Sequence, residues 1–215
     1  MKPLLLIAAS LLPLSVFATI DIQPHVLEIQ QPNAVVNVIN HGTNTQYIRV
    51  ELSQLNNPGE SPEQESLTPV GEQPHPMLFA VPAKLTLGPN QSARIIIKAL
   101  QAPDKEQVYR LSVAPENTLK ITGGEGVVVG VQISYMGLVR HLPVSPQPQW
   151  AHHCIDGKLA LENTGNIRLQ WHQLKNQLEE IDDFNLYPGQ FRQLPISNIQ
   201  GMIEDKLFSL QCSAE

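Results

Sequence analysis

The sequence has few charged residues, few aromatic residues, only two cysteines and a single long apolar run. Charged residues make up 16% of the 215 positions and aromatic residues 5%, and the formal net charge is −6 at pH 7. An acidic chain without basic runs lacks the charge that attracts nucleic acid or anionic lipid, so we expect neither as a partner. After residue 18 no segment is long and apolar enough to span a bilayer as a helix. We therefore expect no membrane insertion.

The one long apolar run lies at the start of the chain. Lys2 supplies a positive charge, residues 4–17 are almost all apolar, and Val16 and Ala18 occupy the two positions that a signal peptidase reads. This order predicts a cleavable secretory signal peptide over residues 1–18. The alternative is an N-terminal membrane anchor, but the run is shorter than the roughly 20 residues that a spanning helix needs.

The two cysteines, Cys154 and Cys212, are predicted to form a disulfide. An even number of cysteines in a secreted chain favours a bridge. Cys212 also shares one strand face with Phe208 and Leu210, so its side chain is expected to point inward. In the chain-entropy model a bridge over this separation contributes roughly 4 kcal/mol. Two free thiols are the alternative.

Apolar and polar residues alternate along most of the chain after the signal peptide. The alternating runs are short and end at turns that contain Gly, Pro or Asn, a pattern typical of an all-β sandwich. Residues 143–148 hold three prolines and little to bury, which predicts a hinge between domains. We therefore predict two β-sandwich domains, over residues 19–143 and 144–215.

Motifs for catalysis or cofactor binding are not evident. His152, His153 and Cys154 form the best metal-ligand cluster, but a zinc site needs about four converging ligands and the second pair is missing. Gly123-Gly124-Glu125-Gly126 precedes a strand, so it lacks the helix N-terminus that binds phosphate. No nucleophile motif is present. We predict no catalytic residues, no metal and no cofactor.

The longest predicted strand covers residues 127–136. The odd-numbered side chains would lie on one face, namely Val127, Val129, Val131, Ile133 and Tyr135. The even-numbered residues Val128, Gly130, Gln132, Ser134 and Met136 would lie on the other. One interpretation is an ordinary core strand. The other is an edge strand that offers its odd-numbered side chains to another protein by β-strand addition, while the even-numbered side chains pack in the domain's own core.

Several segments, in this order, resemble the periplasmic chaperones of the chaperone–usher pathway, the PapD-like family. The segments span nearly all of the chain after the signal: residues 22–28, 85–95, 108–111, the valine-rich strand with Leu142-Pro143, 161–166 and 186–190. The turns Asn163-Thr164-Gly165-Asn166 and Tyr187-Pro188-Gly189-Gln190 look closer to the alternate or archaic branch. The resemblance implies two immunoglobulin-like sandwiches set at an angle.

The resemblance also implies a function, which is capture of pilus subunits in the periplasm. Such chaperones insert the last strand of their first domain into a subunit that lacks its own last strand, and deliver the subunit to an outer-membrane usher. In this register Val129, Val131 and Ile133 fall on the donor positions and Val127 extends them.

The family also holds the C-terminal carboxylate of the subunit with two basic residues. His25 stands at the first of these positions. Leu138 stands at the second and cannot bind a carboxylate, but Arg140 lies two residues away on the same face. The predicted carboxylate anchor is therefore His25 with Arg140.

Two other classes of function stay open at this point. The first is a structural or adhesive secreted β-sandwich module, such as a pilus component. The second is a metal-dependent periplasmic enzyme with His152, His153 and Cys154 as ligands.

Overall fold

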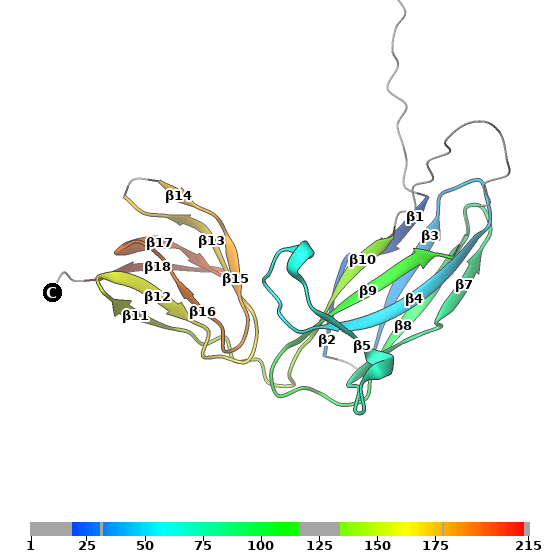
Figure 1. Cartoon of the computed structure of the whole chain (residues 1–215), viewed down its shortest axis with the longest axis horizontal. Coiled ribbons are helices and arrows are strands. Elements are labelled where there is room, and N and C mark those ends of the chain that lie inside the picture. The colour runs from blue at the N-terminus through cyan, green and yellow to red at the C-terminus, as the bar shows by residue number, and fades with distance from the viewer. Residues whose placement is uncertain (1–18, 31, 117–133, 178, 213–215) are drawn as a thin grey trace, which may run out of the picture.

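The computed structural model describes residues 19–30, 32–116, 134–177 and 179–212. Within these ranges the chain is almost entirely β-strand, with two short 3-10 helices, η1 (Pro62–Gln64) and η2 (Val70–Glu72), and no α-helix. The described strands form two sandwiches, β1–β10 and β11–β18, which lie side by side (Figure 1). The predicted all-β fold with two immunoglobulin-like sandwiches is confirmed.

The first sandwich consists of a four-stranded and a six-stranded sheet. The four-stranded sheet has the order β1 (Ile20–Gln23), β3 (Asn33–Asn40), β8 (Ser92–Ala99) and β6 (Leu78–Val81). The six-stranded sheet has the order β2 (Val26–Ile29), β10 (Tyr135–His141), β9 (Gln107–Pro115), β4 (Gln46–Leu55) and β5 (Leu67–Pro69), with β7 (Lys84–Leu87) also paired to β4. Two of these strands, β2 and β10, run parallel.

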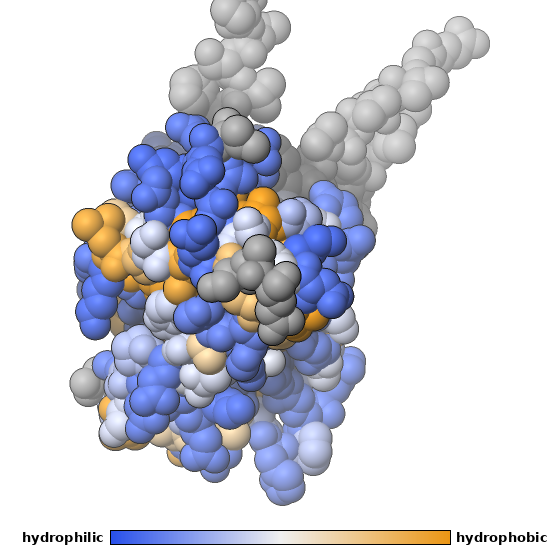
Figure 2. Space-filling model, turned by 90° about the vertical axis from the view of Figure 1, so that its left-hand side faces the viewer, coloured by the Kyte–Doolittle hydropathy of each residue, from blue (hydrophilic) through white to orange (hydrophobic). Residues whose placement is uncertain are grey.

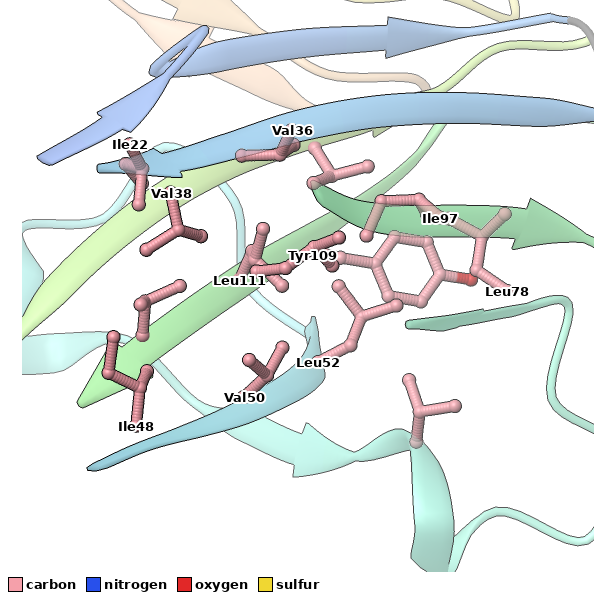
Figure 3. Packing of buried hydrophobic residues seen from close by; sticks show 14 of the residues in the cluster. Ile22, Val36, Val38, Ile48, Val50, Leu52, Leu78, Ile97, Tyr109 and Leu111 are labelled. Atoms are coloured by element: carbon pink, nitrogen blue, oxygen red, sulfur yellow. The ribbon is translucent and has the colours of Figure 1, made fainter. Parts of the chain in front are cut away.

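The core of the first sandwich follows directly from the alternation in the sequence. In β4 the side chains of Ile48, Val50 and Leu52 are buried, whereas Tyr47 is 55% exposed. The buried face of β4 meets side chains from β3, β8 and β9 between the two sheets (Figure 3). Burial of each aliphatic side chain of this kind stabilises the fold by roughly 1.5–3 kcal/mol. Because apolar residues alternate with polar ones, this energy favours the packing in which the apolar face of each strand points inward.

The second sandwich is smaller and also has two sheets. One has the order β11 (Ala151–Ile155), β12 (Lys158–Glu162) and β16 (Phe191–Gln193). The other has the order β14 (Glu180–Ile181), β13 (Leu169–Lys175), β17 (Asn198–Ile203) and β18 (Lys206–Gln211), with β15 (Phe184–Leu186) also paired to β13.

Aromatic rings and a disulfide hold the small second core together. Trp171 is fully buried, with the rings of Trp150 and Phe208 edge-on to it at centroid distances of 5.2 and 5.0 Å. The predicted disulfide between Cys154 and Cys212 is present. Because Cys154 belongs to β11 and Cys212 follows β18, the bridge joins the two sheets of this sandwich.

Each sandwich contains the same hydrogen-bonded corner, built on one buried asparagine. Asn40 and Asn163 are both fully buried. The side-chain amide of Asn40 donates to the Leu87 carbonyl at 3.0 Å, and that of Asn163 donates to the Leu186 carbonyl at 2.7 Å. In both corners the asparagine Oδ1 accepts from the backbone N–H of a glycine two residues later, at 2.9 Å. The two domains therefore contain equivalent corners, each with the same side-chain hydrogen bonds from a buried asparagine.

The turn opposite each asparagine is repeated as well. The segments are Leu-Gly-Pro-Asn-Gln over residues 87–91 and Leu-Tyr-Pro-Gly-Gln over residues 186–190. In each, the glutamine Oε1 accepts from the backbone N–H three residues earlier, namely from Gly88 and from Tyr187. The two turns differ at two of the five positions, because Tyr187 stands where the first domain has Gly88, and Gly189 where it has Asn90.

Candidate functional site

The two sandwiches meet through an apolar contact centred on Tyr187. This side chain is 7% exposed and packs with Leu55 and Val108 of the first sandwich, and Leu138 lies against the same cluster. Burial raises the pKa of Tyr187 above its ordinary value, so the phenol stays neutral. Tyr187, which stands where the first corner has Gly88, is thus the side chain of the second corner that docks the domains.

Glu106 is the polar centre of the domain junction. Its side chain is 0% exposed and accepts hydrogen bonds from Arg140 Nε at 2.6 Å and Nη2 at 2.9 Å. A third bond comes from the backbone N–H of Arg168, at 2.6 Å. The backbone N–H of Glu106 donates to the Asn166 carbonyl at 2.8 Å. One buried carboxylate therefore links strand β10 of the first sandwich to the backbone of the second.

Arg140 lies on β10 with its side chain only 7% exposed. The parallel pairing of β10 with β2 places Glu28 opposite Arg140, and Arg140 Nη1 donates to the Glu28 carboxylate. Burial alone would lower the pKa of Arg140, but the hydrogen bond and charge of Glu106 outweigh it, and the net shift is upward. The guanidinium is therefore a permanent buried charge with two carboxylate partners.

The other predicted anchor residue, His25, lies at the surface. Its ring is 69% exposed, with Nε2 3.9 Å from Asp21 Oδ1. The backbone carbonyl of His25 accepts from the Leu138 N–H at 2.8 Å, so His25 and Arg140 are close along neighbouring strands. Their side chains nevertheless have different partners, since Asp21 belongs to the four-stranded sheet and Glu28 to the six-stranded sheet. The predicted pairing stays a prediction.

Arg110 is a junction residue that the sequence analysis missed. It lies on β9 directly opposite Leu138, which stands where the resemblance implies a basic residue. Its Nε and Nη2 both donate to the carboxylate of Glu65, with 3.0 Å between Nε and Oε2. The alternation along β9 could have pointed to Arg110. Its neighbours Tyr109 and Leu111 are buried, so Arg110 is a charged residue on the outward face of the strand.

Glu65 reaches Arg110 from the segment of residues 56–66, which lies between the two halves of the molecule (Figure 1). The segment is closed at its base, since Asn57 Nδ2 donates to the Gln64 carbonyl at 2.8 Å and Asn57 Oδ1 accepts from the Ser66 N–H at 2.6 Å. It also touches the second sandwich, because Gln190 Nε2 donates to the Pro58 carbonyl at 2.7 Å. This segment is therefore part of the junction.

The four predicted donor residues Val127, Val129, Val131 and Ile133 lie outside the described residues. Tyr135 and Met136 of the predicted strand 127–136 are described, as the first residues of β10, and show which of its faces is buried there. Tyr135 packs against the core of the first sandwich and Val139 is 1% exposed, whereas Met136 is 51% exposed. Expecting the even-numbered face to pack in the domain's own core was therefore wrong for Met136. Strand pairing with β9 holds the odd-numbered residues inward here.

The candidate metal ligands do not form a metal site. Cys154 is bound in the disulfide, so it has no thiolate to offer. His153 Nε2 lies 3.5 Å from Glu162 Oε2, and the ring of His152 lies 6.1 Å from that of Trp150. Among the residues that the structure describes, no group of three or more His, Cys, Asp or Glu could hold a metal ion.

The outer end of the second sandwich differs from the junction. Figure 2 shows a mainly hydrophilic face with hydrophobic residues in separate groups. Of the helices within the described ranges, none is long and apolar enough to cross a membrane. Among the described residues, the buried charged pair Glu106 and Arg140 lies where the two sandwiches meet.

Comparison with known proteins identifies the fold. No protein-family model matches the chain. The chain is 27% identical over 172 residues to a CS1 fimbrial subunit of Escherichia coli, an alignment that covers 77% of this chain and 71% of that protein.

Several solved structures that match this chain are of pilus chaperones or of their complexes. A chain in a chaperone–tip adhesin complex of CFA/I fimbriae matches with a TM-score of 0.70 at 19% identity, over 92% of this chain and 100% of that chain. The class 5 fimbriae chaperone CfaA matches with 0.70 at 18% identity, over 91% and 100%. The CsuC–CsuE complex from archaic Csu pili of Acinetobacter baumannii matches with 0.58 at 18% identity, over 90% and 98%.

Proposed function

This chain has the fold of the PapD-like pilus chaperones, and we propose that it is a periplasmic chaperone that binds pilus subunits and delivers them to an outer-membrane usher. The observation that carries the proposal is the match to pilus chaperones across both sandwiches, over 92% of the chain. Cleavage of the signal peptide 1–18 would place a donor domain, 19–143, and a second domain, 144–215, in the periplasm. The activity is binding, with no cofactor and no catalysis.

The alternative, a structural or adhesive pilus component, has one point in its favour. The curated relative is itself called a fimbrial subunit. The domain junction argues against this alternative. There the ion pair of Glu106 and Arg140 is buried, and so is the apolar contact of Tyr187. A single-domain pilus subunit would have one immunoglobulin-like fold, so the two joined sandwiches of this chain suit a chaperone better.

Strand addition is the proposed way in which this chain binds its partner. In the register of the β9–β10 pair, Tyr135 lies opposite Val113. Position 133 would then lie opposite Pro115, the last residue of β9. If the alternation of β10 continues, Val127, Val129, Val131 and Ile133 share the core side of the sheet, and the first three lie beyond the end of β9. A partner with an open groove would complete the core there.

The carboxylate anchor is proposed at the junction face of the first sandwich. Arg140 supplies a permanent charge, and its Nη1 can donate a charge-assisted hydrogen bond to a carboxylate. His25 would approach from the start of β2, where its ring is exposed. Arg110 is diagonal to Arg140 across β9 and β10, at about 7 Å between Cα atoms.

A pair of valine substitutions tests the proposal. Val131→Asp would place an unpaired charge in the groove of the pilus subunit, which costs several kcal/mol. A loss of about 4 kcal/mol weakens binding about a thousandfold. Val128→Asp carries the same charge on the opposite face and is the matched control.

The measurement is co-purification of periplasmic proteins with the tagged chain, followed by mass spectrometry. The wild-type chain and Val128→Asp should retain pilus subunits, and Val131→Asp should lose them while staying folded. Equal retention by Val131→Asp would exclude this strand as the donor. If the wild-type chain recovers no pilus subunit, the proposed function itself is contradicted.

A further inference from the structure

Arg140 is held differently on its two sides. On the inner side Nε and Nη2 are bound by Glu106, whose side chain is 0% exposed. On the outer side Nη1 is bound by Glu28, whose side chain is 54% exposed. The inner carboxylate fixes the plane of the guanidinium. The outer carboxylate binds Nη1 from β2, the edge strand of the sheet.

The neighbouring pair of Arg110 and Glu65 shows a different arrangement. The Glu65 side chain is 4% exposed and the Arg110 side chain 22% exposed. Removing Glu65 from Arg110 would require the closed segment 56–66 to move and would leave buried charges unpaired. This pair is a structural bond that holds the segment in the junction.

Glu28, by contrast, can leave Arg140 at little cost. A half-exposed carboxylate recovers its hydration when it turns away, and such surface pairs are worth at most about fivefold in an equilibrium constant. Arg140 keeps its inner partner meanwhile, so its side chain stays in place. An incoming carboxylate would find a pre-oriented guanidinium and would have to displace only Glu28.

We infer that Glu28 is an internal occupant of the carboxylate site, which neutralises the outward Nη1 of Arg140 in the free chaperone and is displaced when a polypeptide carboxylate binds. This inference rests on the proposed function, since the carboxylate is that of a captured subunit. Competition with Glu28 lowers the affinity for any single carboxylate. Stable capture then needs the donor strand to bind as well, and stray carboxylates are rejected.

The test uses a small probe and needs no pilus subunit. The probe is an N-acetylated alanine dipeptide with a free C-terminal carboxylate, and the same dipeptide with a C-terminal amide is the negative control. Binding to the full-length secreted chain is followed through the side-chain NMR signals of Arg140. The variants are Glu28→Gln and Glu28→Ala, with Glu51→Gln as the matched control, because Glu51 is an exposed carboxylate on β4 of the same sheet.

The free acid should shift the Arg140 signals and the amide should not. Both Glu28 variants should bind the acid more tightly than the wild-type chain, by up to about fivefold, and Glu51→Gln should bind like wild type. Unchanged or weaker binding in the Glu28 variants would overturn the inference, as would Arg140 signals that do not respond to the acid in any variant. Failure of the proposed function would instead appear in the co-purification experiment, whatever the dipeptide does.

Discussion

Removing the Glu106 carboxylate should uncouple the two sandwiches. In Glu106→Ala, Arg140 loses both inner hydrogen bonds while its side chain stays 7% exposed, and the Arg168 N–H loses its acceptor. Breaking a buried ion pair by deleting one partner typically costs 3–5 kcal/mol, and an orphaned buried N–H about 1–3 kcal/mol more. Glu28 remains as a partner for Arg140, so we expect a loss of about 4 kcal/mol.

The two tryptophans make this loss measurable by domain. Trp150 and Trp171 both lie in the second sandwich, so their fluorescence follows unfolding of that domain, whereas circular dichroism follows both. In urea the two signals of the wild-type chain should change together. In Glu106→Ala they should separate, because each sandwich then unfolds without the junction.

Two further variants show whether the effect belongs to the junction. Glu116→Ala removes a surface ion pair with Lys84 and should cost no more than about 1 kcal/mol. Glu106→Leu combined with Arg140→Met should recover part of the loss, because an apolar pair leaves no buried charge. The reasoning is refuted if Glu106→Ala unfolds at the same urea concentration as Glu116→Ala with coincident signals.

Three other outcomes are expected. His141 is 2% exposed and burial lowers its pKa, so the unfolded chain binds a proton at His141 more readily than the folded chain. The free energy of unfolding should therefore fall as the pH drops below about 6.5, by at most about 1.4 kcal/mol per pH unit. Urea titrations of His141→Gln should lack this pH-dependent component. Asn163→Ala should lower the free energy of unfolding of the second sandwich by about 3 kcal/mol, seen in fluorescence, whereas Asn40→Ala should act on the first sandwich. Reduction of the disulfide between Cys154 and Cys212 should destabilise the second sandwich by roughly 4 kcal/mol, and a thiol titration of the unfolded, unreduced protein should find no free thiol.

Local patterns in the sequence were enough for core strands such as β4 and β9 and for the disulfide. Alternation of side chains along β4 and β9 predicts one buried face because the pleat has a period of two. Cys212 could be placed inward for the same reason, and its partner followed from an even count of two. These features depend on neighbours in the chain, which a sequence shows directly.

The tertiary structure alone decided the junction. Glu106, Arg140 and Arg168 are far apart in the chain and meet only because β10 pairs with β9 and the second corner docks on that sheet. The side taken by Met136 also came from strand pairing, since alternation fixes which residues share a face but not which face is inward. Likewise, the equivalence of Asn40 and Asn163 depends on carbonyls brought from distant turns. Long-range register and domain docking therefore set the site, because no local preference encodes them.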